Sequence, residues 1–228
     1  MPKQVVLKQY RESLTPTQAA EGIQAAIKNA KSLVSDAELL LENQRWSRAV
    51  AIAILAIEES GKPSWLRSLL LARDEKELRE EWKNYRSHIK KNLIWLSTLL
   101  AADGATQLDE FSSIFADDSD HGQTMDALKQ IAIYSDAYEN CHWSLPGEVV
   151  DEGLAKSIVK IAHLIAASDA GAMTTAPELE LWVKHMKPVW KDETAEMKRA
   201  LLACYAEAHS LGVLQGNVTP NDMVKFVL

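Results

Sequence analysis

Hydrophobic residues recur at steps of three and four along most of the chain, the spacing that aligns side chains on one face of an α-helix. Between residues 16 and 42 this spacing defines one buried stripe. The next segment is apolar at every position from Ala49 to Ile57. A helix that is apolar on all sides must be surrounded by other elements. We therefore predict that residues 45–60 form the central helix of an all-α bundle, joined to the first helix by a tight corner at 42–44.

Capping residues and helix breakers set the other predicted boundaries. Thr15 begins a capping box before the first helix, and Asp74 begins a second one before another long helix. Gly61 and Pro63 predict an end to the central helix, followed by a short helix at 64–72. Further helices are predicted in four segments: residues 124–134, 147–168, 176–186 and 192–211.

The same pattern predicts how the chain is organised. We interpret residues 1–14 as a lead-in, 15–146 as an up-and-down helical bundle with an acidic loop at 103–123, and 147–228 as additional C-terminal helices packed on the bundle. The aromatic segment 134–146 is expected to pack back across the bundle. Alternating runs are too short to predict a strand. No flexible linker follows the aromatic segment, which favours one composite domain and leaves a separate C-terminal subdomain as the alternative.

Charge and cysteine usage narrow the function classes. The 228 residues include 32 acidic and 25 basic ones, a net charge of −7, whereas a general electrostatic grip on nucleic acid needs a basic footprint. A local basic site is compatible with this charge. Cys141 and Cys204 show neither metal-ligand spacing nor a disulfide framework, which is typical of a reducing cytoplasm. Without a secretion signal or a long apolar run, we expect a cytoplasmic protein that does not enter a membrane.

The strongest candidate for chemistry is a polar strip centred on His88. If the predicted helix runs straight to about residue 102, four polar residues share a narrow strip beside its apolar face: Glu81, Asn84, His88 and Lys91. A histidine can act as general acid or base near neutral pH. Lys91 could steady a phosphate or an oxyanion, and Glu81 could orient the histidine. The alternative is structural, since most histidines at the edge of a helical stripe are ordinary hydrogen-bonded side chains.

Glu58, at the end of the central helix, is a further candidate. Its spacing from Lys62 predicts an i, i+4 ion pair, whereas a functional role would place its carboxylate near His88. The pattern for metal binding is weak, because Glu139 and His142 form a single Glu-x-x-His pair where a carboxylate site needs two. The sequence also lacks a glycine-rich phosphate loop. We therefore expect no metal and no other cofactor.

Three segments together carry a family resemblance. They are DAELLLENQRWSRAVAIAILAIEESGK at 36–62, YRSHIKKN around His88, and IAIYSDAYENCHWSLP at 131–146. In combination they resemble the AbiV-type abortive infection proteins, a branch of the HEPN superfamily. The resemblance implies a HEPN-like bundle and a growth-arresting role in antiviral defence. Many HEPN proteins are metal-independent endoribonucleases, in which two protomers bring together an Arg…His motif and the histidine activates a ribose 2′-hydroxyl.

The sequence departs from that motif, which has four to six positions between arginine and histidine. Arg86 and His88 are separated by one residue, and on a straight helix they point about 160° apart. Either a partner supplies the cation, Lys91 substitutes for it, or the catalytic function is altered or absent.

Two hypotheses follow. The first is a toxin-like effector that acts on RNA, as a metal-independent endoribonuclease or as an RNA-binding translation inhibitor, in a homodimer whose cleft combines two copies of His88. The second is a non-catalytic HEPN interaction module that senses or binds a viral or host protein.

Overall fold

The computed structural model describes residues 8–87, 121–138, 141–167 and 173–214. Within these ranges the chain is a helical bundle, and its single sheet is a two-stranded hairpin. The predicted all-α class is therefore confirmed. None of the helices in the described ranges combines the length and the apolar content needed to cross a bilayer.

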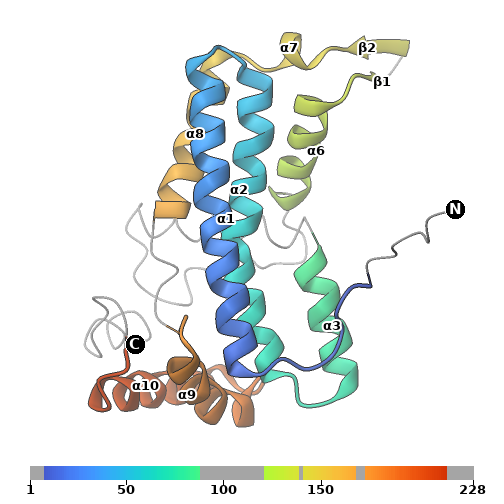
Figure 1. Cartoon of the computed structure of the whole chain (residues 1–228). Helices are drawn as coiled ribbons and strands as arrows, with labels where there is room; N and C mark the ends of the chain where they lie inside the picture. Colours follow the sequence, from blue (N-terminus) through green and yellow to red (C-terminus); the bar gives the residue numbers. More distant parts are fainter. Residues whose placement is uncertain (1–7, 88–120, 139–140, 168–172, 215–228) are drawn as a thin grey trace, which may run out of the picture.

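A long antiparallel hairpin of α1 (Pro16–Glu42) and α2 (Trp46–Leu71) forms the axis of the molecule (Figure 1). The predicted capping box is present: Gln18 N–H donates to Thr15 Oγ1 at 3.2 Å, and Thr15 N–H donates to Gln18 Oε1 at 2.9 Å. The predicted corner is also confirmed, and Gln44 turns it with a φ of 58°. Caps and corner are local features, which explains why the sequence predicts them well.

α2 continues through Gly61 and Pro63, so the predicted end of the central helix at this point is wrong. A proline inside a helix removes a hydrogen bond and crowds the preceding turn, at a cost of about 3 kcal/mol. The segment beyond it carries four buried leucines: Leu66, Leu69, Leu70 and Leu71. Full burial of one leucine contributes about 1.5–3 kcal/mol. Burial of this leucine cluster therefore outweighs the local cost of the proline.

The upper core lies beside the corner that joins α1 to α2. It packs the hairpin against α6 (His121–Ile133) and α8 (Glu152–Ala167). Its buried residues are Ala30, Val34, Ala37, Ala49, Val50, Ala51, Ala53, Ile54, Ala56, Ile57, Met125, Ala132, Val150, Ala155, Ile158, Val159, Ala162, Ile165 and Ala166. The small side chains allow the helices to approach closely, and α8 completes the bundle along both helices of the hairpin.

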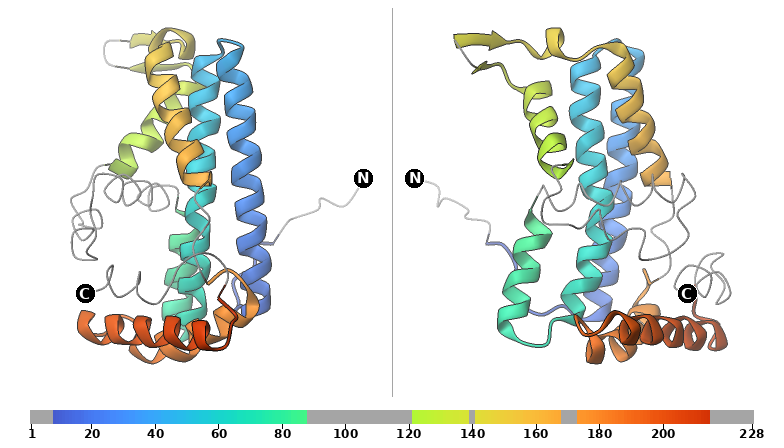
Figure 2. Two further views of the ribbon diagram at one scale, coloured as in Figure 1. Left: turned by 90° about the vertical axis from the view of Figure 1, so that its left-hand side faces the viewer. Right: turned by 180° about the vertical axis from the view of Figure 1, so that it is seen from behind.

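The lower core lies at the opposite end of the hairpin. It packs the hairpin against α3 (Glu75–Arg86), α9 (Ala176–Met186) and α10 (Thr194–Ser210). The 3-10 helix η3 (Lys187–Val189) connects the last two, and α10 lies crosswise under the bundle (Figure 2). The buried residues are Ala19, Ile23, Leu66, Leu69, Leu70, Trp82, Met173, Leu179, Leu181, Cys204 and Ala208.

The C-terminal helices follow the predicted order with two corrections. The helix predicted at 147–168 is divided into α7 (Pro146–Val149) and α8, because Val150 is extended and Asp151 begins a new helix by accepting the Leu154 N–H at 2.8 Å. α10 starts two residues later and ends one residue earlier than predicted, and Leu211, which follows its last residue, is 60% exposed. The helices predicted at 176–186 and 192–211 are confirmed as α9 and α10.

The aromatic segment after α6 differs from its prediction. It forms β1 (Asp136–Tyr138) and β2 (His142–Ser144), an antiparallel pair in which Ala137 faces Trp143. It does not pack back across the bundle: Trp143 is 64% exposed, and the hairpin projects from the upper end of the molecule (Figure 1). The alternating runs here are only three residues long, which is too short for a strand signal in the sequence.

Candidate functional site

α3 carries most of the predicted site residues, and it is shorter than predicted. Asp74 caps its start by accepting the Glu77 N–H at 2.8 Å. The helix ends at Arg86, and Ser87 is extended, with φ −74° and ψ 121°. The predicted helix is therefore interrupted at Ser87, and its remaining part at 88–102 lies outside the described residues. Lys83 and Arg86 in the last turn favour this end, since basic side chains complement the negative end of the helix dipole.

This early end changes the basis of the predicted polar strip. His88 and Lys91 lie outside the described residues, as does most of the acidic loop at 103–123. The predicted strip aligned His88 with Glu81 and Asn84 by assuming one straight helix. Because Ser87 is extended, that assumption does not hold. The roles of His88 and Lys91 stay predictions.

Arg86 joins the lead-in to α3. Its guanidinium lies over the Trp82 ring, 4.7 Å from the centroid, and donates to the carbonyl oxygens of Tyr10 and Trp82. The Trp82 indole N–H in turn donates to the Glu12 carbonyl at 3.1 Å. The lead-in next to α1 is thus held against α3, and Arg86 has a structural function there.

A basic hollow opens beside these contacts. Its volume is about 540 Å³. Six residues line it: Arg11, Arg79, Trp82, Lys83, Arg86 and Ser87. Burial, reinforced by the neighbouring charge of Arg11, lowers the pKa of Arg86 from its ordinary value. Four cationic side chains around one concavity attract anions, even on a protein whose net charge is −7.

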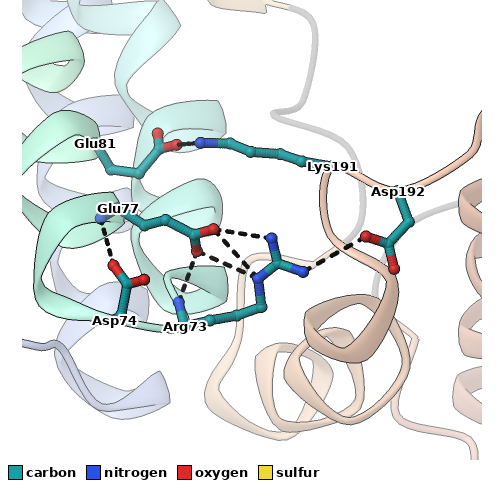
Figure 3. A network of polar contacts seen from close by, with 6 residues as sticks. All are labelled: Arg73, Asp74, Glu77, Glu81, Lys191 and Asp192. Carbon is teal, nitrogen blue, oxygen red and sulfur yellow. Dashed lines mark hydrogen bonds and ion pairs between the residues drawn. The ribbon is translucent and has the colours of Figure 1, made fainter.

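Glu81 lies on a different side of α3, where it contacts the C-terminal part of the chain. Its side chain is 3% exposed, and its Oε1 pairs with Lys191 Nζ at 3.0 Å (Figure 3). Its Oε2 is buried and has no hydrogen-bond partner among the described residues. Lys191 adopts a positive φ of 63°, an uncommon conformation for a residue with a side chain. The described partner of Glu81 is therefore a lysine from a distant part of the chain, and the predicted role of Glu81 toward His88 stays a prediction.

Lys191 is the residue that sequence reasoning missed. It follows η3 in an irregular turn, and nothing in its sequence context indicates a contact with α3. The next residue reinforces the junction: Asp192 pairs with Arg73, which also binds Glu77 at 2.8 Å (Figure 3). The side-chain hydrogen bond from Arg73 lowers the pKa of Glu77, and the same bond raises the pKa of Arg73.

The remaining predicted residues have other surroundings. Asn84 is half-buried on α3, and its carbonyl accepts the Ser87 N–H at 2.9 Å. Glu58 is 3% exposed and pairs with Lys129 of α6 at 2.6 Å. The predicted pair between Glu58 and Lys62 is wrong, because Lys62 binds Glu59 instead. Glu58 thus contributes to the contact between α2 and α6, and its predicted role toward His88 stays a prediction.

The described residues contain no candidate metal site. No three side chains among the His, Cys, Asp and Glu residues of these ranges gather closely enough to hold an ion. Cys204 is buried in the lower core, and burial raises the pKa of its thiol to about 12. This thiol is therefore not a nucleophile at neutral pH.

The helical bundle with its alanine-rich hairpin agrees with the expected HEPN-like fold, and comparison with family models gives the family. The AbiV family of HEPN proteins matches residues 18–167, more than half of the chain. The chain therefore belongs to the AbiV family, as the resemblance implied, and has an abortive-infection, HEPN-type function. No curated protein and no solved structure matches. The family match includes α3 and ends with α8, so α9, α10 and Lys191 lie beyond it.

Proposed function

We propose that this AbiV-family protein is a toxin-like effector that acts on RNA, with the basic hollow as its phosphate-binding surface. The observation that carries the proposal is the convergence of Arg11, Arg79, Lys83 and Arg86 around one concavity. RNA affinity depends strongly on contacts between basic side chains and phosphates. A local basic site reconciles such contacts with a net charge of −7.

The position of the hollow in the chain connects it with the predicted catalyst. Ser87 lines the hollow, and the next residue in the sequence is His88. In the proposed reaction His88 accepts the proton of a ribose 2′-hydroxyl, and the 2′-oxygen attacks the adjacent phosphorus. The 5′-oxygen of the following nucleotide leaves and takes up a proton. Arg11, Arg79 and Lys83 of the hollow stabilise the charge that develops on the phosphate, and the reaction needs no metal.

The proposed active form is a homodimer in which two copies of His88 share one cleft. A second protomer would also supply a cation in the place that the family motif gives to its arginine, since Arg86 is engaged by the lead-in. Light scattering at increasing protein concentration tests this point. A monomer at every concentration would exclude a shared cleft.

The nuclease proposal is tested with purified protein, cellular RNA and excess chelator. Wild type is expected to cleave, and His88→Ala to be inactive while its thermal midpoint is unchanged. If both proteins leave the RNA intact and both still block phage growth, the cleavage proposal fails.

RNA binding is tested separately from cleavage. Arg79→Ala/Lys83→Ala removes two charges from the hollow and is expected to weaken binding of a fluorescent single-stranded RNA at least tenfold. The salt dependence should also fall by about 0.7 per lost contact on a log–log scale. The matched control, Lys156→Ala/Lys160→Ala, removes two charges from the exposed side of α8 and should change the affinity less than twofold. Equal losses in both variants would contradict a specific basic hollow.

A second candidate function, the non-catalytic interaction module, has support from a different observation. Large apolar side chains are exposed at the upper end of the molecule, among them Tyr134 and Trp143. Such patches on soluble proteins often mark interaction sites. A protein that binds a viral or host partner through this end would need no chemistry at His88.

A further inference from the structure

Four large apolar side chains are exposed at the upper end of the molecule, and the segment that carries them is here named the apolar tip. They are Tyr134, Trp143, Leu145 and Val149, with exposed fractions of 59%, 64%, 50% and 45%. They follow one another through the end of α6, the β-hairpin and α7. Figures 1 and 2 show these elements projecting beside the corner between α1 and α2. The basic hollow lies on α3, away from this end.

The tip is anchored from below. Arg48 of α2 donates to the Ile133 carbonyl at 2.8 Å, next to the start of the tip. Ser144 is buried and donates its hydroxyl to the Asp136 carbonyl at 3.4 Å, which ties β2 to β1. Val150, directly after the tip, is 2% exposed in the upper core. A surface that is already held in place loses less conformational entropy when a partner binds.

The strand alternation determines which side chains face outward. On β2 the buried Ser144 faces the bundle, and its neighbour Trp143 points to the opposite side, as successive side chains of a strand do. The two strands pair only with each other in the described part of the chain, so each has an outer edge without a strand partner. An extended segment can add to such an edge through backbone hydrogen bonds.

The charged residues around the tip indicate which kind of partner could bind there. Between residues 134 and 152 the sequence has no lysine or arginine. The described residues of this stretch include four acidic ones: Asp136, Glu148, Asp151 and Glu152. Glu152 binds Lys156 at 2.6 Å, and Arg48 beside the start of the tip donates to the carbonyls of Ala132 and Ile133. Exposed apolar side chains with an acidic border complement a segment that carries apolar and basic side chains.

We propose that the apolar tip is a docking surface for an extended protein segment with alternating apolar and basic side chains. The apolar side chains of the segment cover Trp143 and Leu145, and its basic side chains reach the acidic border. The backbone of the segment adds to the free edge of the β-hairpin. This interaction is independent of RNA cleavage, and it gives the interaction-module function a defined surface.

The test uses the full chain and three fluorescent ten-residue peptides: (Lys-Val)5, (Glu-Val)5 and (Lys-Ser)5. Fluorescence anisotropy is expected to show that (Lys-Val)5 binds at least tenfold more tightly than either of the others. The comparison with (Glu-Val)5 isolates charge, and the comparison with (Lys-Ser)5 isolates the apolar contact. Equal binding of all three peptides, or binding of none, would overturn the proposal.

Variants of the protein locate the site. Trp143→Ser is expected to weaken (Lys-Val)5 binding at least tenfold, and Glu148→Gln severalfold with a smaller salt dependence. Leu164→Ser is the matched control, because Leu164 is a 50% exposed leucine on α8 outside the tip, and its affinity should change less than twofold. Equal effects of Trp143→Ser and Leu164→Ser would show non-specific apolar binding and contradict the proposal.

Two further outcomes distinguish a peptide from a second copy of the chain as the occupant of the tip, and the docking proposal from the RNA proposal. If (Lys-Val)5 does not bind but wild type self-associates and Trp143→Ser does not, the tip contacts a second copy of the chain, and the proposal is wrong. Trp143→Ser is also expected to bind RNA as wild type does, and Arg79→Ala/Lys83→Ala to bind (Lys-Val)5 as wild type does. Failure of the docking proposal is therefore distinguishable from failure of the RNA proposal.

Discussion

The upper core and the lower core use the same helical hairpin but are built from different side chains. The upper core is rich in alanine, valine and isoleucine, and its helices pack closely. The lower core contains larger groups, including Leu66, Trp82 and Leu179. The upper core is centred on the continuous apolar run of α2, whereas the lower core combines larger side chains from the hairpin, α3, α9 and α10.

The polar contacts of the two cores differ as well. The upper core has a buried pair, Glu58 with Lys129, and Asp126 lies 2.9 Å from the same lysine. The lower end has several links between α3 and the C-terminal helices or within them. They are Arg73 to Glu77 and Asp192, Lys191 to Glu81, and Lys184 and His185 to Glu207. Most of these groups are partly exposed.

The family match separates the cores in a similar way. It covers every element of the upper core and stops before α9. The lower core is completed by helices beyond the match, which are attached through apolar burial and a polar junction. We infer that the lower end depends more on pH and salt than the upper end, and three predictions test this comparison.

The largest effect is expected from Lys129→Ala in the upper core. Burial favours a lower pKa for Lys129, but the hydrogen bonds that its ammonium donates to Glu58 and Asp126 outweigh burial and raise the pKa above its ordinary value. Removal of the lysine leaves the buried Glu58 carboxylate without this cation. The free energy of unfolding should fall by about 3–5 kcal/mol, measured by chemical denaturation.

The double variant Glu58→Leu/Lys129→Met is the control for this prediction. It replaces both charges with apolar side chains and should recover most of the lost stability. A double variant as unstable as Lys129→Ala would mean that packing at this position, rather than an isolated charge, causes the loss.

A somewhat smaller or equal effect is expected from Leu179→Ala in the lower core. Leu179 is fully buried, and its truncation should cost about 2–5 kcal/mol. Hydrogen exchange should become faster in α9 and α10 while α6 and α8 keep their protection. Leu164→Ala, at an exposed position, is the control and should change neither region. A uniform loss of protection in both cores would show that they unfold as one unit.

The smallest effect is expected from Glu77→Gln at the junction in Figure 3. The hydrogen bond from Arg73 holds the pKa of Glu77 below its ordinary value of 4.5. The pair therefore stabilises the protein above about pH 4.5, and this contribution is lost as the pH falls through the lowered pKa. At neutral pH the substitution should cost less than about 1 kcal/mol.

Hydrogen exchange in α9 and α10 between pH 3 and pH 6 measures this loss. Glu77→Gln should show a weaker acid dependence than wild type. The control is Glu75→Gln on the same helix, whose pair with Arg79 is largely exposed, and it should behave as wild type. An identical acid dependence in all three proteins would remove Glu77 as a cause of pH sensitivity.

Helical spacing placed Glu81 in a polar strip with His88, and this role stays a prediction. In the structure the Glu81 carboxylate pairs with Lys191, which comes from a turn far along the chain and which the sequence did not indicate. Sequence reasoning also treated Arg86 only as a member of a motif, although its main contacts are with the lead-in. Neighbours in sequence can be predicted from helical geometry, but partners from distant segments are chosen by packing.

The basic hollow illustrates the same limit. Arg79, Lys83 and Arg86 share one side of α3 by their spacing, so a basic face could have been read from the sequence. Arg11 joins them because Trp82 and Arg86 hold the lead-in against α3. The overall charge of −7 obscured this local concentration of positive charge.

The amino-acid sequence by itself determined the all-α class, the α1–α2 hairpin and its corner, and the capped starts of α1 and α3. These features depend on residues within about one helical turn of each other, where propensity and capping act directly. Only the tertiary structure decided that α2 passes Pro63, that Glu58 binds Lys129, and that the aromatic hairpin stays exposed. For α2 and for Glu58, the free energy of burial or pairing with a distant segment outweighed the local preference of the chain. The aromatic hairpin stays exposed because no such burial against a distant segment stabilises it.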